Sequence, residues 1–198
     1  MCTAKCARCI GGMLYPLAFI SIVCNIILFF PDWKTKYVVE EREGYGQRIT
    51  VEVKYMGGLV GGGIMVLIPA IHIHMTGKKG CCGNRCGMFL SILFAATGVA
   101  GALYSFVTAV LGLVNGPTCR VLLIWGTPFK GNPGDESYLN NKNLWALCTD
   151  PPNIVEFNIA LFSTLVLVSC LEILLCGIQM VNGLIGCLCG TCRNKGPL

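Results

Sequence analysis

Phe157–Leu188 reads FNIALFSTLVLVSCLEILLCGIQMVNGLIGCL, and this stretch decides the fold. It is apolar on every side of a helix, whereas a surface helix of a soluble protein keeps one polar face. A helix rises about 1.5 Å per residue, so roughly twenty residues cross the hydrocarbon core of a bilayer. The composition agrees with a transmembrane helix. Of the 198 residues, 54% are hydrophobic and 13% are charged, against about 25% charged in soluble domains.

Strongly polar side chains interrupt this apolar run and must be accommodated inside the membrane. Glu172, Cys176, Gln179 and Gly183 are spaced so that they share one helix face. Polar groups at membrane depth face other protein segments, where they hold helices together or line a pocket or ion path. Both roles are open for Glu172, and either one requires partner helices from the rest of the chain. The predicted intramembrane polar site comprises Asn25, Glu172, Gln179 and Asn182.

The fold class expected for the whole chain is an all-α membrane protein, a bundle of four transmembrane helices with a small extracellular domain. Mean hydropathy is +0.67, and three more apolar runs are long enough to span a bilayer. We interpret the chain as one four-span domain, 1–198. Its expected segments are a cytosolic N-terminus at 1–9, spans at 10–30, 55–75, 88–114 and 154–186, extracellular loops at 31–54 and 115–153, a cytosolic loop at 76–87 and a cytosolic tail at 187–198.

The first two spans have additional sequence features. The first follows a basic start that resembles a signal peptide, but its apolar run is too long and lacks a small-x-small cleavage site. We expect an uncleaved signal anchor, with a cleaved signal as the alternative. In the second span, glycines recur four residues apart, which lets helix backbones approach closely. The glycines expected to pack against other helices are Gly57, Gly58, Gly61 and Gly62.

The first extracellular loop contains a strand-like pattern. Arg48–Tyr55 alternates apolar and polar residues, which is the period of a β-strand. Tyr37–Val39 is a suitable partner, and Gly44–Gly46 supplies a turn. We therefore expect a short β-hairpin in this loop, with a disordered loop as the alternative.

Charge and cysteine content both place the two termini in the cytosol. The N-terminus, the 76–87 loop and the tail carry Lys and Arg but no Asp or Glu, as the positive-inside rule expects. Nine of the 14 cysteines fall in these three segments, whereas only Cys119 and Cys148 fall in the extracellular loops. An oxidising compartment favours the pairing of two such thiols. We predict a Cys119–Cys148 disulfide worth about 3–4 kcal/mol.

The nine cytosolic cysteines each lie next to a helix end, and three interpretations compete. S-palmitoylation leads, because an acyl chain attached at this depth enters the adjacent leaflet. A zinc site built from Cys6-x-x-Cys9 and Cys189-x-x-Cys192 requires the termini to meet. Unmodified thiols are the third interpretation. The palmitoylation candidates are Cys2, Cys6, Cys9, Cys81, Cys82, Cys86, Cys187, Cys189 and Cys192.

The sequence contains no pattern typical of catalysis. It lacks a phosphate-binding glycine loop, a zinc-protease helix motif and a nucleophile elbow. His72 and His74 are two residues apart and point to different helix faces, which argues against a shared metal site. The basic residues lie in short patches beside apolar runs, where the expected partner is anionic lipid and not nucleic acid. We expect a protein that is not an enzyme and has no metal or cofactor beyond covalent palmitate and bound lipid or sterol.

Seven stretches are characteristic in combination: MCTAKCARC (1–9), GGLVGGGIMVLIPA (57–70), GCCGNRC (80–86), NGPTC (115–119), LWALC (144–148), ALFS (160–163) and LEILLCGIQMVNGLIGCLCG (171–190). Together they resemble the transmembrane-4 L-six family of tetraspanin-like proteins. The usual glycosylation sequon of that family is absent at Asn158-Ile159-Ala160, no other sequon occurs, and Phe157 replaces the usual tryptophan. These departures argue against glycan-dependent properties in this chain.

The resemblance implies a cell-surface protein without enzymatic activity. Family members associate laterally with integrins, tetraspanins or growth-factor receptors and influence adhesion, migration and proliferation, and some act at lysosomal membranes. The expectation is therefore a membrane organiser of the plasma membrane, with endosomal or lysosomal membranes as further locations and a homo-oligomer as a compatible state. The alternative is a small-molecule or lipid sensor, or a transporter-associated subunit, with its site around Glu172. True tetraspanins carry Cys-Cys-Gly in their large outer loop, whereas Cys81-Cys82-Gly83 of this chain lies in the predicted cytosolic loop. Claudins carry cysteines in the first outer loop, which has none here. Both groups are therefore excluded.

Overall fold

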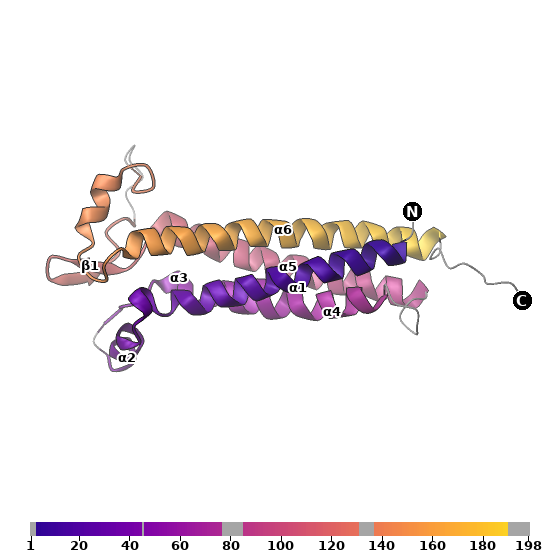
Figure 1. The fold of residues 1–198 in the computed structure, drawn as a ribbon, viewed down its shortest axis with the longest axis horizontal. Coiled ribbons are helices and arrows are strands. Elements are labelled where there is room, and N and C mark those ends of the chain that lie inside the picture. Colours follow the sequence, from indigo (N-terminus) through magenta and orange to yellow (C-terminus); the bar gives the residue numbers. More distant parts are fainter. Residues whose placement is uncertain (1–2, 45, 77–84, 131–136, 190–198) are drawn as a thin grey trace, which may run out of the picture.

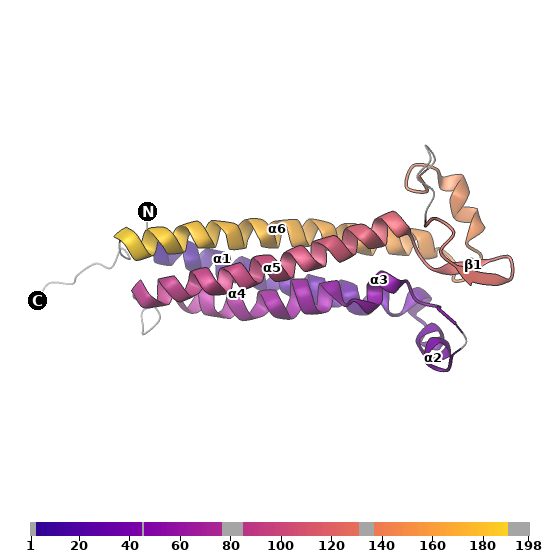
Figure 2. The same ribbon diagram turned by 180° about the vertical axis from the view of Figure 1, so that it is seen from behind.

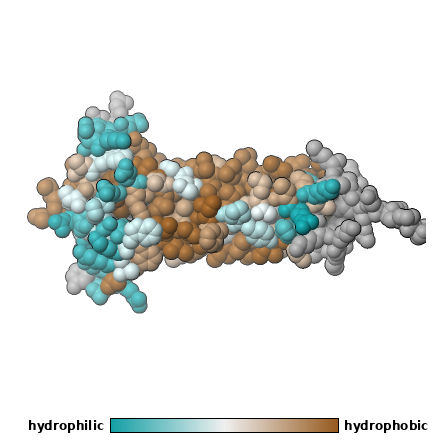
Figure 3. Space-filling model, viewed as in Figure 1, coloured by the Kyte–Doolittle hydropathy of each residue, from teal (hydrophilic) through white to brown (hydrophobic). Residues whose placement is uncertain are grey.

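Four long helical segments run side by side in the computed structural model, which describes residues 3–44, 46–76, 85–130 and 137–189 (Figure 1). Within these ranges, four helices are long and apolar enough to cross a membrane. The predicted fold class is therefore confirmed. Figure 3 shows the broad hydrophobic belt that these helices form. The helices are α1 (Thr3–Leu28), η2 continuing into α4 (Gly57–Ile64 and Met65–Thr76), α5 (Arg85–Asn115) and α6 (Ile154–Cys189).

The four helices form a closed ring of contacts. Helix α6 packs against α5 and α1, and α4 packs against the same two helices. Figures 1 and 2 show that the bundle has two distinct ends. The terminal end holds the start of α1, the end of α4, the start of α5 and the end of α6. The loop end holds residues 29–56 and 116–153.

The helices extend beyond the apolar runs at several points. Helix α1 begins at Thr3, so the basic N-terminal residues are helical, and it ends at Leu28, ahead of the short 3₁₀ turn η1 at Pro31–Trp33. Helix α6 continues to Cys189. Hydropathy marks only the part of a helix that matches the hydrocarbon core, whereas backbone hydrogen bonds continue into the interfacial layer. The second spanning segment opens with a wide π-type turn over Gly57–Ile64.

Glycines let the second segment approach two neighbours at once. A Cβ atom on Gly61 would lie 2.5 Å from the Gly101 carbonyl oxygen of α5, and one on Gly57 would overlap Thr108 of the same helix. A Cβ on Gly58 would lie 2.8 Å from the Ser21 carbonyl oxygen of α1. Glycines four residues apart therefore share a neighbour, and the absence of side chains brings three helices into backbone contact.

The β-hairpin expected in the first loop is wrong, because neither strand forms and helices occur at both places. Lys36–Arg42 forms helix α2 and Val51–Lys54 forms the short helix α3. Ile49 and Val53 are both buried and are four residues apart, so they fit a helical turn as well as a strand. Glu52, which the alternation assigned to solvent, is only 6% exposed. Packing against the bundle thus selected the helical period over the strand period, both of which this short sequence allowed.

A two-stranded sheet does occur, but in the second loop. Strands β1 (Cys119–Val121) and β2 (Ile124–Gly126) pair antiparallel. A 3₁₀ segment, η4 (Lys142–Leu147), follows. The predicted disulfide joins Cys119 to Cys148, with 5.4 Å between their Cα atoms. The small core around it consists of Cys119, Phe129, Tyr138, Ile154 and Val155.

Candidate functional site

Glu172 is the most unusual side chain inside the bundle. It lies on α6 and has no solvent exposure. The Ser21 hydroxyl of α1 donates a hydrogen bond to its Oε1 atom at 3.3 Å, while its Oε2 atom has no hydrogen-bond partner among the described residues. A Cβ atom on Gly62 would lie 3.1 Å from Oε2, so the bare backbone of the π-type turn packs directly onto the carboxyl group. Glu172 thus lies where α1, α6 and the glycine segment meet.

Asn25 lies one helical turn from Ser21 and has a different partner. Its side-chain Oδ1 accepts a hydrogen bond from the Leu59 backbone N–H at 3.2 Å. This N–H belongs to the π-type turn, where the usual helical hydrogen-bond pattern is disturbed. Asn25 therefore satisfies a backbone donor of the glycine segment, and the structure does not bring it to Glu172 as a hydrogen-bond partner.

Gln179 and Asn182 form a second polar cluster two helical turns further along α6. The Gln179 amide donates to the Ser91 hydroxyl of α5 at 3.1 Å, and the Asn182 amide donates to Gln179 Oε1 at 3.2 Å. At about 1.5 Å per residue, Gln179 lies roughly 10 Å along the helix from Glu172. The expected single polar stripe is thus divided between two neighbours, with the Glu172 contact on α1 and the Gln179 contact on α5.

Serine hydroxyls supply partners that sequence reasoning missed. Ser169 of α6 donates to Ser105 of α5 at 2.9 Å, and both are fully buried. Ser21 and Ser91 likewise place a hydroxyl opposite Glu172 and Gln179 of α6. Serine is common in apolar helices, so the only usable sequence signal is its location in a predicted span.

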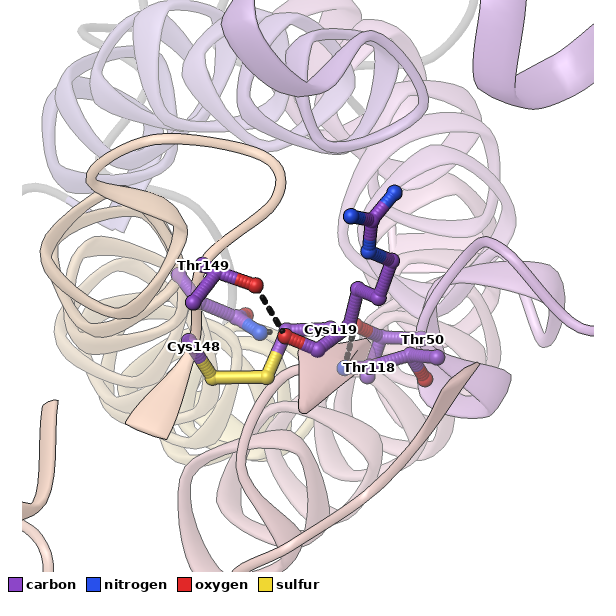
Figure 4. Close-up of a disulfide and its surroundings, with 7 residues drawn as sticks. Thr50, Thr118, Cys119, Cys148 and Thr149 are labelled. Atoms are coloured by element: carbon purple, nitrogen blue, oxygen red, sulfur yellow. Dashed lines mark hydrogen bonds between the residues drawn. A yellow bond between two sulfur atoms is a disulfide. The ribbon is translucent and has the colours of Figure 1, made fainter. Parts of the chain in front are cut away.

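The disulfide at the loop end is embedded in backbone hydrogen bonds (Figure 4). The backbone N–H and the hydroxyl of Thr149 both donate to the Arg120 carbonyl oxygen, at 3.0 and 2.8 Å. On the other side, the Thr118 backbone N–H donates to the Thr50 hydroxyl of the first loop at 3.2 Å. The covalent bridge therefore fixes a junction at which the first loop meets the second.

A ring cluster reinforces this junction. The buried Tyr37 hydroxyl donates to Asp150 at 2.9 Å, and its ring meets the edge of Trp125. The Arg48 guanidinium lies 4.3 Å from the Trp125 ring centroid, within range of a cation–π contact. Burial, together with the hydrogen bond to Asp150, raises the pKa of Tyr37 above its usual range. The cluster clamps helix α2 to the hairpin of the second loop.

A second tyrosine anchors the disulfide loop to the bundle. The Tyr138 hydroxyl donates to the Leu113 carbonyl oxygen near the end of α5, and its ring stacks on Phe129. Burial raises the pKa of Tyr138 to about 12. At the same end, the Asn115 amide donates to Glu52 at 2.6 Å. These contacts join segments far apart in the chain, so no local sequence pattern could have predicted them.

The candidate palmitoylation cysteines gather near the terminal end, as far as the structure describes them. Cys9 and Cys86 are exposed, and Cys6 and Cys187 are half-buried. Cys189 is the last residue of α6. Cys2, Cys81, Cys82 and Cys192 lie outside the described residues. The structure therefore does not test either acylation or the alternative zinc site.

The two histidines of α4 lie against different partners. His72 stacks on Phe94 with 4.4 Å between ring centroids, and His74 lies 5.8 Å from the Tyr15 ring. In the part of the chain that the structure describes, no three metal-ligating side chains are grouped together. Both histidine rings thus lie against aromatic rings of neighbouring helices.

Asn158 is the position at which the resemblance described above would lead one to expect a glycosylation sequon, which this sequence lacks. It is only 3% exposed, and its amide donates to the Thr50 hydroxyl at 3.4 Å. A sugar attached to this nitrogen would have to displace the first loop. The buried amide therefore agrees with the loss of the sequon in this sequence.

Comparisons with known proteins come to one result. A family model described as "L6 membrane protein" matches residues 1–193. The human protein named Transmembrane 4 L6 family member 5 is 45% identical, with 98% of each chain covered. Human members 4 and 1 are 42% and 41% identical, covering 98% and 97% of this chain and 95% and 96% of their own. No solved structure matches.

Proposed function

Because this chain belongs to the L6 membrane protein family, we propose that it is a membrane organiser without enzymatic activity that binds other membrane proteins laterally through α6. One observation carries the proposal. Large apolar side chains recur on α6 at alternating spacings of four and three residues, and all of them are exposed on the outside of the bundle. This is the spacing of a helix–helix packing seam. The seam consists of Leu167, Leu171, Leu174, Ile178, Val181, Ile185 and Leu188.

Apolar grooves flank this seam on both sides. One groove, with a volume of about 390 Å³, lies between α5 and α6 and is lined by Leu113, Val166 and Leu167. The other, of about 370 Å³, lies between α1 and α6 and is lined by Met13, Leu17 and Leu174. A ridge between two grooves is the surface that interdigitates with a partner transmembrane helix. The surface thus supports lateral packing, whether the partner is another protein or a second copy of this chain.

The partner classes follow from the resemblance, namely integrins, tetraspanins and growth-factor receptors. We place the protein in the plasma membrane, and also in endosomal or lysosomal membranes, with both termini in the cytosol. The arrangement of the bundle supports this topology, because the start of α1 and the end of α6 lie at the same end (Figure 1). The disulfide at the opposite end suits an oxidising compartment.

Acylation of the terminal-end cysteines is part of the proposal. Cys9 and Cys86 are exposed beside helix ends, where a thioester-linked chain would enter the adjacent leaflet. Acyl exchange that depends on hydroxylamine should label the wild-type protein and weaken in the Cys9→Ser/Cys86→Ser variant. Unchanged labelling would assign acylation to other cysteines, and no labelling at all would remove it from the proposal.

The role of the seam can be tested by truncating two of its exposed side chains, which leaves the core of the bundle unchanged. Leu174→Ala/Val181→Ala removes two exposed side chains from the seam, while Leu93→Ala/Val107→Ala removes two comparably exposed ones from α5. We expect the first variant to lose most co-purification with integrin, tetraspanin or receptor from mild detergent, and the second to retain it. Absence of all three partner classes from the wild-type preparation would refute the proposal.

A second candidate function is favoured by the Oε2 atom of Glu172, which has no hydrogen-bond partner among the described residues. A buried carboxyl oxygen without a donor is a position at which a small ligand or a proton could act, as in a sensor or a transporter-associated subunit. A thermal shift with amino acids, sterols or other lipids that disappears in Glu172→Gln would favour this function. If no such ligand shifts the melting temperature, Glu172 serves only to hold the helices together.

A further inference from the structure

The tip of the β1–β2 hairpin exposes the most prominent apolar group of the loop end. Leu122, Leu123 and Ile124 are 84%, 86% and 77% exposed. They are consecutive, and the two leucines form the two-residue turn between the paired residues Val121 and Ile124. In Figure 3, hydrophobic atoms protrude beyond the hydrophilic surface where Figure 1 places this hairpin. Single exposed leucines are ordinary, but a contiguous cluster at a protruding tip indicates a contact surface.

The backbone of the tip is also unfavourable for leucine. Leu122 has φ of 56°, a left-handed conformation that glycine adopts without cost. For a residue with a bulky side chain this conformation costs of order 1 kcal/mol or more. Glycine at this position would therefore improve both the local conformation and the solubility of the tip. Neither folding nor solubility therefore explains a leucine here, whereas a contact made by the tip would.

The order of residues along the hairpin matches the layers of a membrane surface. Below the two leucines of the turn comes the pair Val121 and Ile124, and below that the pair Arg120 and Trp125. Arg120 is exposed. A strand rises about 3.3 Å per residue, so the apolar tip and first pair extend roughly 5–7 Å beyond the Arg–Trp level. Membrane-bound amphipathic helices bury their apolar faces about 5–10 Å into the bilayer interface, so this depth is typical of insertion. Tryptophan and arginine prefer the level of the headgroups, which is where the Arg120 and Trp125 pair would lie.

The hairpin points away from the bilayer that holds the bundle. Figures 1 and 2 show that it extends beyond the loop-end tips of α5 and α6. The surface that it can enter is therefore that of a second bilayer facing the loop end. We propose that residues 121–124 form a membrane-inserting tip that tethers this protein to an apposed bilayer, with Arg120 contacting its headgroup phosphates.

A lipid surface fits the tip better than a protein does. Burying three aliphatic side chains removes roughly 200–400 Å² of apolar surface, by the usual transfer scale. A stable protein interface needs about 800 Å² per partner, which the tip alone does not reach. The tip is also convex, so a protein partner would need a matching pocket, whereas a bilayer deforms around an inserted side chain. Charge complementarity adds to this, because exposed Arg120 lies one residue pair below Val121 and Ile124 and can donate hydrogen bonds to headgroup phosphates.

The test uses the full chain in phosphatidylcholine nanodiscs and protein-free vesicles containing about 30% phosphatidylserine. Flotation of the vesicles should carry the wild-type nanodiscs with them. Leu122→Ser/Leu123→Ser should weaken this binding at least about tenfold, because two inserted leucines are lost. The matched control is Leu139→Ser/Leu147→Ser, which removes two exposed leucines of the same loop, and it should bind like the wild type.

Two single substitutions separate insertion from folding. Leu122→Gly relieves the backbone conformation, so its melting temperature should rise while vesicle binding falls about threefold. A purely structural tip would move both quantities in the same direction. Arg120→Gln should remove most of the difference between anionic vesicles and pure phosphatidylcholine vesicles, and leave the remaining binding less sensitive to salt.

Three outcomes would overturn the proposal. The first is no flotation of wild-type nanodiscs with protein-free vesicles. The second is binding by Leu122→Ser/Leu123→Ser equal to that of the wild type, which would place any lipid contact elsewhere on the chain. The third is association only between two particles that both carry the protein, which would assign the tip to a second copy.

Discussion

The bundle interior and the loop end are stabilised by different kinds of contact. In the interior, bare glycine backbone meets neighbouring helices, and single hydrogen bonds such as Ser21 to Glu172 join them. At the loop end, a disulfide, a cation–π contact and buried tyrosines join segments that are distant in sequence, as in the Tyr37 to Asp150 hydrogen bond. The interior therefore depends on shape, and the loop end on redox state and pH. Each prediction below changes one of these regions and should leave the other intact.

The largest effect is expected from filling the glycine contact in the interior. Gly61→Leu forces a side chain against the Gly101 carbonyl oxygen, where the first atom alone would lie 2.5 Å away. Because backbone cannot move aside as a flexible side chain can, we expect a loss of about 4 kcal/mol or more and little folded protein. Thermal unfolding in detergent measures the effect.

The control for this experiment is another helical glycine. A Cβ atom on Gly177 of α6 would meet nothing within 4 Å. Gly177→Ala should therefore stabilise the protein by about 0.5–1 kcal/mol, since alanine favours a helix. Equal destabilisation at both positions would show that close helix approach is not what the glycines provide.

Removing the disulfide is the second-largest change, and it acts at the loop end. Cys119→Ala/Cys148→Ala should cost about 2–4 kcal/mol, because the unfolded loop regains its freedom. Loss of protection should be confined to residues 116–153 in hydrogen exchange, while α1, α4, α5 and α6 stay protected. If the four helices lose protection equally, the two regions are not independent.

Alkaline pH should weaken the loop end through Tyr138. Burial raises the pKa of Tyr138 to about 12, from about 10 in an unfolded chain. The stability that depends on the protonated phenol is therefore complete below about pH 10 and is lost as the pH rises to about 12. Tyr138→Phe should cost about 1 kcal/mol at neutral pH, for the lost hydrogen bond, and should reduce this alkaline loss.

The control for the pH dependence is a comparison of two proteins that differ only at Tyr138 and have the same bundle interior. Thermal unfolding of wild type and Tyr138→Phe should be measured from pH 8 to pH 12. Parallel curves for the two proteins would mean that another group causes the alkaline loss. Tyr37, whose pKa is also raised, titrates in the same direction and is the next residue to substitute.

The smallest effect is expected from a single hydrogen bond of the interior. Ser21→Ala removes the donor to Glu172 Oε1 and leaves a fully buried carboxyl group without a described partner. We expect a loss of about 0.5–1 kcal/mol if the carboxyl stays, the net value of one long hydrogen bond, and a smaller loss in Ser21→Ala/Glu172→Leu, where both polar groups are gone. A double-mutant cycle on thermal unfolding measures the coupling between the two residues.

The sequence by itself determined the membrane-spanning fold and the disulfide. Length and hydrophobicity of an apolar run are local properties, and a run such as Phe157–Leu188 has no alternative to a membrane helix. The disulfide could also be predicted from the sequence, because only Cys119 and Cys148 fall in the predicted extracellular loops and two cysteines allow one pairing.

Tertiary structure alone decided the first loop and the partners of the polar groups. Burial of Ile49 and Val53 is compatible with a strand and with a helical turn, and only the folded chain shows that Val51–Lys54 is helical, with Glu52 buried and hydrogen-bonded to Asn115. Likewise, the contact from Ser21 to Glu172 spans 151 positions of sequence. It depends on how far α1 is rotated about its axis, and that rotation is set by the packing of glycine backbone between the helices. Helical periodicity shows which residues share a face, but not which neighbour the face meets.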